Sequence, residues 1–415
     1  MSKKTSAFYD KCSSMLVSIE SCRSAGSLEP SIAKFTTLID EITEFLEESE
    51  GEDDVDEDVE EEEEYCVMEL IRMRGVASYQ LALTALQLSD SHLADVYLNR
   101  LGFRTRLLTT IFAYHNLPKI VDKTSPLKVV NQILNASLFD ALKKAFDEES
   151  NFWSYHKYPT NIFFSYNLSL TSPSKSLISQ LVHTVYSRLD SEFEGLKKAR
   201  SAEVWAHTRT GEGQHQFHYD LDEVALGKGK IKSPIISCVL YLEAGSSNPT
   251  LICDKKIAET KREPLKGWYC TPEQNRLIAF PGNLLHCVIP GIPDSVVGGR
   301  RTTVMIGFWE EVEVCDEDLG PNMVLKSQEW TNGMDVVEGG GVGEAVGGDV
   351  FCIDKCIEDV KFENDLQGVE EYDQYYDQDI GFTGRFFLRE GLEDIDGEVL
   401  KGMGMAKPQG KRRKI

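Results

Sequence analysis

The chain has 415 residues, 41% of them hydrophobic, which is enough for one large domain with extensions or for two domains. Its net charge is −24, and no stretch approaches the roughly eighteen consecutive apolar residues of a membrane-spanning helix, which argues against a membrane protein. Nucleic acid is not an expected partner either, because phosphate binding requires clustered Lys and Arg.

The ends and the cysteines indicate a compartment. The N-terminus lacks the apolar run of a signal peptide, and none of the ten scattered cysteines forms a CxxC pair, so a reducing intracellular compartment, cytoplasm or nucleus, is expected. The basic end, 411–414, has two interpretations, a nuclear-import signal and a solvated tail.

Residues 1–125 are predicted to form a helical region. Apolar side chains recur at helical spacing over 6–46, and helical patterns return over 66–114, with breaks near Asp90–Ser91 and Gly102. Between them lies the acidic run 47–64, which contains fourteen carboxylates and is expected to be a disordered or loosely helical insertion.

Residues 126–312 have a different character, with a core over 200–310. Two helices are predicted near 137–149 and 174–195, and the segments beyond residue 200 are too closely spaced for crossover helices. The pattern favours an α+β fold whose core is an antiparallel sandwich or barrel, such as a jelly roll, and not a parallel sheet. The predicted strands are Asn161–Leu170, Ala202–Arg209, Gln214–Asp220, Pro234–Leu242, Arg276–Phe280, Leu284–Ile289 and Arg301–Trp309.

Residues 313–415 are predicted to be an acidic C-terminal extension. Its glycine-rich piece, 338–343, resembles a flexible linker and lacks the Gly-Lys-Ser/Thr that a phosphate-binding loop requires.

The candidate site begins with His218 and Asp220. Residues i and i+2 of a strand point to the same face, so an imidazole and a carboxylate project into one space. Sixty-eight residues after His218, a Phe-Pro-Gly turn leads into an apolar strand that carries His286. Two histidines and one carboxylate on one face of an iron(II) ion leave three coordination positions open.

A second candidate feature opens the last strand of the core. Arg301 and Thr303 share a strand face, and a buried arginine is costly unless it meets an anion. Its planar fork fits a carboxylate, so a dicarboxylate could bind the metal at one end and Arg301 at the other. Arg300 is the rival, because both arginines begin an Arg-x-Thr sequence.

Each piece alone is weak evidence, and their order along the chain carries the prediction. In this order residues 200–310 resemble the 2-oxoglutarate and iron(II)-dependent oxygenases, and within them the prolyl-4-hydroxylase-like branch. The segment 237–242 is similar to a core strand of that branch. The sequence Trp205-Ala206-His207-Thr208-Arg209 resembles an uncharacterised subgroup.

The resemblance implies a double-stranded β-helix with supporting helices, and it implies roles for single residues. His218, Asp220 and His286 would bind Fe(II). The distal carboxylate of 2-oxoglutarate would be bound by the residues at the other end of the cavity, namely Arg301, Thr303, Tyr241 and, as the alternative arginine, Arg300.

The implied activity is hydroxylation of a protein or peptide side chain, with O2 as cosubstrate, ascorbate as reductant, and release of succinate and CO2. Asp222 is predicted to serve its loop instead of the metal. Trp205, Trp268 and Trp309 either line the pocket or pack the core. The competing hypothesis is a catalytically inactive jelly-roll binding module with acidic regions that recruit partners.

Overall fold

The computed structural model describes residues 3–24, 26–49, 60–101, 103, 105–112, 114, 120–156, 165–171, 176–209, 215–245, 248–258, 266–289, 300–312, 324–326, 350–353, 357–359 and 387–388. Three predicted features lie outside this range. They are the middle of the acidic run, the glycine-rich piece and the basic end.

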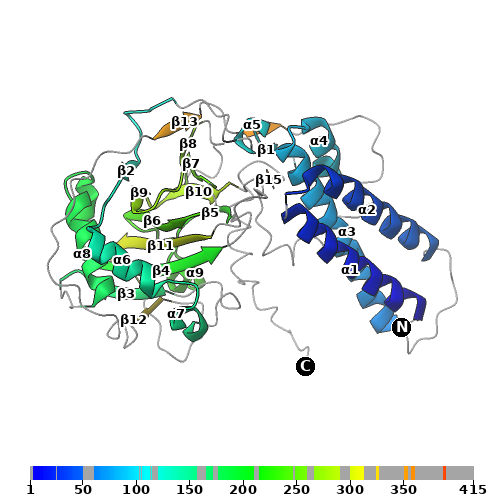
Figure 1. Ribbon diagram of the computed structural model, residues 1–415, viewed down its shortest axis with the longest axis horizontal. Helices are drawn as coiled ribbons and strands as arrows, with labels where there is room; N and C mark the ends of the chain where they lie inside the picture. The colour runs from blue at the N-terminus through cyan, green and yellow to red at the C-terminus, as the bar shows by residue number, and fades with distance from the viewer. Residues whose placement is uncertain are drawn as a thin grey trace, which may run out of the picture.

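The predicted helical N-terminus is confirmed over the described residues up to Arg100. The helices there are α1 (Lys3–Ser24), α2 (Leu28–Ser49), α3 (Glu60–Gln87) and α4 (Ser91–Arg100). The first three pack along one another, as Figure 1 shows. The predicted break near residue 90 has a local cause. Ser89 adopts φ 64°, and the Asp90 side chain caps α4 by accepting a hydrogen bond from the Leu93 amide.

The prediction of helix up to residue 114 is wrong beyond α4. The chain forms strand β1 (Thr105–Leu107) and the short helix α5 (Thr109–Phe112). Strand β1 lies between β14 (Ile357–Asp359) and β15 (Phe387–Leu388) in a small antiparallel sheet. Backbone partners from far along the chain thus override the local helical pattern.

A buried ion pair fixes β1 to α4. Arg106 Nε donates to Asp95 Oδ1 at 2.6 Å, and the two side chains are 2% and 4% exposed. We expect Asp95→Ala to lower the free energy of unfolding by about 3–5 kcal/mol, because it removes the buried carboxylate that pairs with the Arg106 guanidinium. Urea unfolding would measure this loss. An effect below about 1 kcal/mol, the range of exposed pairs such as Lys11–Glu41, would contradict the expectation.

The rest of the chain forms two larger sheets (Figure 1). The major sheet has the order β12 (Val324–Lys326), β3 (Ser165–Ser169), β4 (Ser201–Arg209), β11 (Arg301–Trp309), β6 (Ile236–Ala244), β9 (Arg276–Pro281) and β2 (Lys128–Val130). The minor sheet has the order β13 (Phe351–Ile353), β8 (Gly267–Cys270), β7 (Thr250–Lys256), β10 (Leu284–Val288) and β5 (His215–His218). All pairings are antiparallel except β12 with β3.

The two sheets face each other across a buried interior. Side chains of both contribute to one apolar cluster there, among them Met305 and Val239 of the major sheet and Ile252 and Trp268 of the minor sheet. Alternate residues of the major sheet pack on its other face against α6 (Ala136–Ala145) and α8 (Leu177–Leu189), which Figure 1 shows along that side. The remaining short helices are α7 (Asn151–Tyr155), η2 (Glu194–Lys198) and α9 (Glu223–Gly227).

The helical region packs against the outer face of the minor sheet. One contiguous buried cluster includes Leu98 of α4 and Phe112 of α5 together with Phe217, Leu285 and Cys287 of the minor sheet. The outward side chains of the minor sheet are therefore not surface positions. Among the described helices, none is long and apolar enough to cross a membrane.

Most predicted strands are present, with shifted ends. Strand β11 has the predicted bounds, whereas β5 ends at His218, two residues earlier than predicted. Strands β7 and β8 were not predicted. The mixed helix and antiparallel-sheet class is confirmed.

Candidate metal centre

Two strands of the minor sheet bring the predicted histidines together. His218 ends β5 and is the direct partner of His286 in β10, and the ring centroids lie 4.1 Å apart. On its other side His286 pairs with Ile252, whose side chain belongs to the interior cluster. Both imidazoles therefore project into the space between the sheets.

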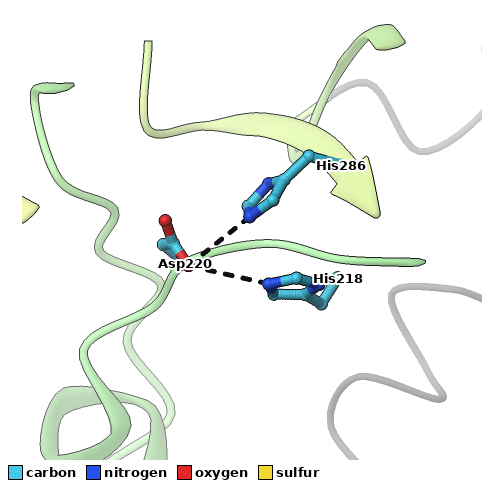
Figure 2. Close-up of side chains that lie close together, drawn as sticks. All are labelled: His218, Asp220 and His286. Atoms are coloured by element: carbon cyan, nitrogen blue, oxygen red, sulfur yellow. Dashed lines mark ion pairs between the residues drawn. The ribbon is translucent and has the colours of Figure 1, made fainter. Parts of the chain in front are cut away.

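The position of Asp220 differs from the prediction that it shares a strand with His218. It lies beyond the end of β5, so the alternation of a strand does not place its carboxylate. The Asp220 carboxylate nevertheless lies beside both histidine side chains, as Figure 2 shows. Asp220 Oδ1 lies 3.9 Å from His218 Nε2 and 3.7 Å from His286 Nε2.

The three side chains form a cluster that fits a metal ion. One ligand atom of each residue lies within 4.8 Å of the others, which allows a single ion to contact all three with bonds of about 2–2.5 Å. Two nitrogen donors and one oxygen donor suit a divalent transition metal better than Mg²⁺ or Ca²⁺, which favour oxygen ligands.

Neighbouring groups orient two of these ligands. His286 Nδ1 lies 3.0 Å from the Leu284 carbonyl oxygen, so an Nδ1 proton would leave the Nε2 lone pair directed at the cluster. Ser237 Oγ donates to Asp220 Oδ2 at 2.6 Å, which leaves Oδ1 facing the histidines. No sequence pattern indicates this role for Ser237, because it lies on β6 of the facing sheet.

Asp222 serves the backbone, as predicted. Its carboxylate is fully buried and accepts a hydrogen bond of 2.8 Å from the Ala225 amide, which caps α9. One oxygen of the Asp222 carboxylate is therefore bonded to the backbone of α9 and not to the metal cluster.

Arg301 lies buried at the start of β11, 4% exposed. Its guanidinium carbon is 5.3 Å from the centroid of the Tyr241 ring, and Nη2 donates to Thr250 Oγ1 at 3.3 Å. The Tyr241 hydroxyl lies 2.7 Å from the same Thr250 oxygen. Burial lowers the pKa of Arg301, and its buried Nε has no hydrogen-bond partner among the described residues. A buried donor of this kind is free to donate to an anionic ligand.

Arg300 points elsewhere. Its Nη2 lies 2.6 Å from Glu148 Oε1, and the Glu148 side chain is 73% exposed. Glu148 follows α6, which packs on the far face of the major sheet, so the two arginines have partners on different sides of this sheet.

Two further histidines line the space between Arg301 and the cluster. Thr303 of β11 pairs with His207 of β4 and with Tyr241 of β6, so their side chains share the inner face. The ring of His215 lies 6.0 Å from that of His207 and 4.3 Å from that of His218. Burial holds the pKa of His207 well below its ordinary value, with the nearby Arg209 and Arg301 acting in the same direction, so this imidazole is neutral at pH 7.

The tryptophans named from the sequence are all buried. Trp205, Trp268 and Trp309 are 8%, 6% and 1% exposed, and the first two belong to the interior cluster. The packing role is therefore present for Trp205 and Trp268.

Comparisons with known proteins give the following. No protein-family model matches the chain, and the comparison with curated proteins finds no match. Among solved structures, a prolyl-4-hydroxylase from Pseudomonas putida is similar at 15% identity and a TM-score of 0.30, over 45% of this chain and 90% of that one. HygX from Streptomyces hygroscopicus with nickel and 2-oxoglutarate bound is similar at 10% identity and a TM-score of 0.29, over 47% and 87%. Its iron-bound form is similar at 12% identity and a TM-score of 0.27, over 48% and 92%.

Proposed function

We propose that this protein is an Fe(II)- and 2-oxoglutarate-dependent dioxygenase. The observation that carries the proposal is the convergence of His218, Asp220 and His286 on one point between the sheets, from two strands that are distant in sequence. A buried, incompletely bonded guanidinium at the other end of the same interior supports it.

The proposed architecture is a double-stranded β-helix, or jelly roll. The facing antiparallel sheets and their shared interior cluster support it. We assign the oxygenase domain to residues 126–312 with its core at 200–310, preceded by the helical region 1–125 and followed by the extension 313–415.

We assign iron to His218 Nε2, Asp220 Oδ1 and His286 Nε2. The fit rests on the nitrogen and oxygen donor set and on the bonds that orient Asp220 and His286. When bound, iron would supply the oxidising chemistry that couples decarboxylation of 2-oxoglutarate to substrate hydroxylation. The chain itself would present three ligands on one side of the ion and leave the opposite side to cosubstrate and oxygen.

We assign the distal carboxylate of 2-oxoglutarate to Arg301. A guanidinium can donate two parallel hydrogen bonds to a carboxylate, and the buried site strengthens both. The Tyr241 hydroxyl and the Thr303 side chain, on the same face, would complete the carboxylate site. His207 would then form the floor between the two ends of the cosubstrate, and its neutrality avoids a second cation there.

Ser237 allows a direct test of the metal assignment. We expect Ser237→Ala to weaken binding of Mn²⁺ or Co²⁺ about tenfold to a hundredfold, because Asp220 loses the bond that directs Oδ1 to the metal. Titration calorimetry on the full chain would measure this affinity. Ser233→Ala is the matched control, since the buried Ser233 hydroxyl has no partner among the described groups. Equal affinity of the Ser237 variant and wild type would contradict the assignment.

The proposed substrate is a protein or peptide side chain, with ascorbate keeping the iron reduced, and the proposed compartment is the cytoplasm or nucleus. Purified protein supplied with Fe(II), ascorbate and 2-oxoglutarate should release succinate in air and none under argon. Metal binding without succinate release, on any candidate peptide, would instead indicate the binding module.

A further inference from the structure

A buried glutamate lies beside the metal cluster, on the side away from Arg301. Glu203 of β4 is 2% exposed and lies between the apolar residues Ala202 and Val204. In the major sheet it pairs with Gly307 of β11, and Gly307 pairs in turn with Ser237 of β6. Glu203 and Ser237 therefore project from the same face on either side of a glycine, and Ser237 holds Asp220.

The glycine between them makes room for an indole N–H. A Cβ atom at Gly307 would come within 2.8 Å of Trp309 Nε1, so the Trp309 ring folds back over the glycine. This nitrogen is buried and has no hydrogen-bond partner among the described residues, although Trp309 is only 1% exposed. A buried donor without a partner costs about 1–3 kcal/mol and can be completed only by an acceptor, so a cation here would contact the face of the indole ring and not its N–H.

The other side of Glu203 offers acceptors. Asn167 of β3 is its direct strand partner, and the buried Asn167 Oδ1 also has no hydrogen-bond partner among the described groups. The Ser165 hydroxyl lies next to the Glu203 carboxyl. Trp205, two residues along β4, adds an aromatic face on the same side of the sheet.

The charges around Glu203 are negative. Burial is the main cause that raises the pKa of Glu203 to about 8, and Asp220, Glu223 and Asp222 act in the same direction. No described Lys, Arg or His forms an ion pair with it. A glutamate kept for packing alone would need partners for its carboxyl and its polar neighbours, whereas no cation among the described side chains pairs with this group of acceptors.

We propose that Glu203 binds a positively charged group of the substrate, an ammonium or a guanidinium such as a lysine or arginine side chain carries. This inference rests on the proposed oxygenase function and narrows its substrate class. The cation would lie between the Glu203 carboxylate and Asn167 Oδ1, with the indoles of Trp205 and Trp309 beside it. From there a neighbouring carbon of the substrate would face the metal across Gly307.

Two probes that differ only in charge test the proposal. The full chain, loaded with Mn²⁺ and 2-oxoglutarate, is titrated with n-propylguanidinium and with n-propylurea, which has a similar planar head and no charge. We expect wild type to bind the guanidinium at least about tenfold more tightly, because the pair forms in a buried site. We expect Glu203→Gln to lose this preference and Glu243→Gln to retain it. Glu243 accepts a hydrogen bond from Thr302 on the opposite face of the sheet.

Equal affinity of wild type for the two probes would overturn the proposal without the need for any variant. A preference that survives in Glu203→Gln would also overturn it. Succinate release by wild type is measured separately. Its absence together with a guanidinium preference would reject the oxygenase function, whereas succinate release without the preference would reject only the substrate class.

Discussion

His218→Ala, Asp220→Ala and His286→Ala are each expected to abolish succinate release and to weaken Mn²⁺ or Co²⁺ binding by more than about 100-fold. The three donor atoms form one cluster, and the structure places no fourth described His, Cys, Asp or Glu in that cluster to replace a lost ligand. Since loss of an outer bond alone costs 10- to 100-fold, loss of a ligand should cost more. Calorimetric metal titration and a coupled succinate assay measure the two effects.

His183→Ala is the control for a histidine change. His183 lies on α8, which packs on the far face of the major sheet, and we expect this variant to bind metal as wild type does. Circular dichroism would verify that each variant is folded. Wild-type metal affinity in a folded His286→Ala protein would remove the basis of the proposed function.

Arg301→Ala is expected to raise the KM for 2-oxoglutarate by at least about 100-fold and to change kcat less. The variant removes two charge-assisted hydrogen bonds to the distal carboxylate, each contributing about 1.5–3 kcal/mol. Initial rates of succinate release over a range of 2-oxoglutarate concentrations would measure both constants. Arg301→Lys should recover only part of the affinity, because a lysine cannot donate the paired bonds.

Arg300→Ala is the matched comparison. This residue pairs with the exposed Glu148, so we expect an unchanged KM. The reverse result, a high KM for Arg300→Ala and a normal one for Arg301→Ala, would assign the carboxylate to the other arginine.

The sequence predicts the strands that carry both histidines and Arg301. Apolar, β-branched and aromatic residues identify β10 and β11, and the same kind of pattern covers the residues before His218. Asp220 comes close to the histidines from a loop, and residue alternation cannot predict that position. The Asp220 carboxylate is held in this position by the hydrogen bond from Ser237, which becomes its neighbour only after the sheets have formed.

The missed strands have a related cause. Strand β8 is buried at every residue and β7 at five of its seven, because the interior covers one face of the minor sheet and the helical region covers the other. Neither strand therefore shows the alternation that identifies a half-exposed strand. Glu203 was missed as well, because a single acidic residue in a predicted strand indicates no role until its cross-strand neighbours are known.

The cluster that joins the helical region to the minor sheet bears on the metal centre. His218 and His286 point inward from β5 and β10, while Phe217, Leu285 and Cys287, their immediate neighbours in sequence, point outward into that cluster. The outer face of the strands that carry both imidazoles thus packs against residues of the N-terminal helical region. Substitutions in that remote segment can alter the spacing of the metal ligands without contacting the ion. The geometry of the candidate metal centre therefore depends on both segments together.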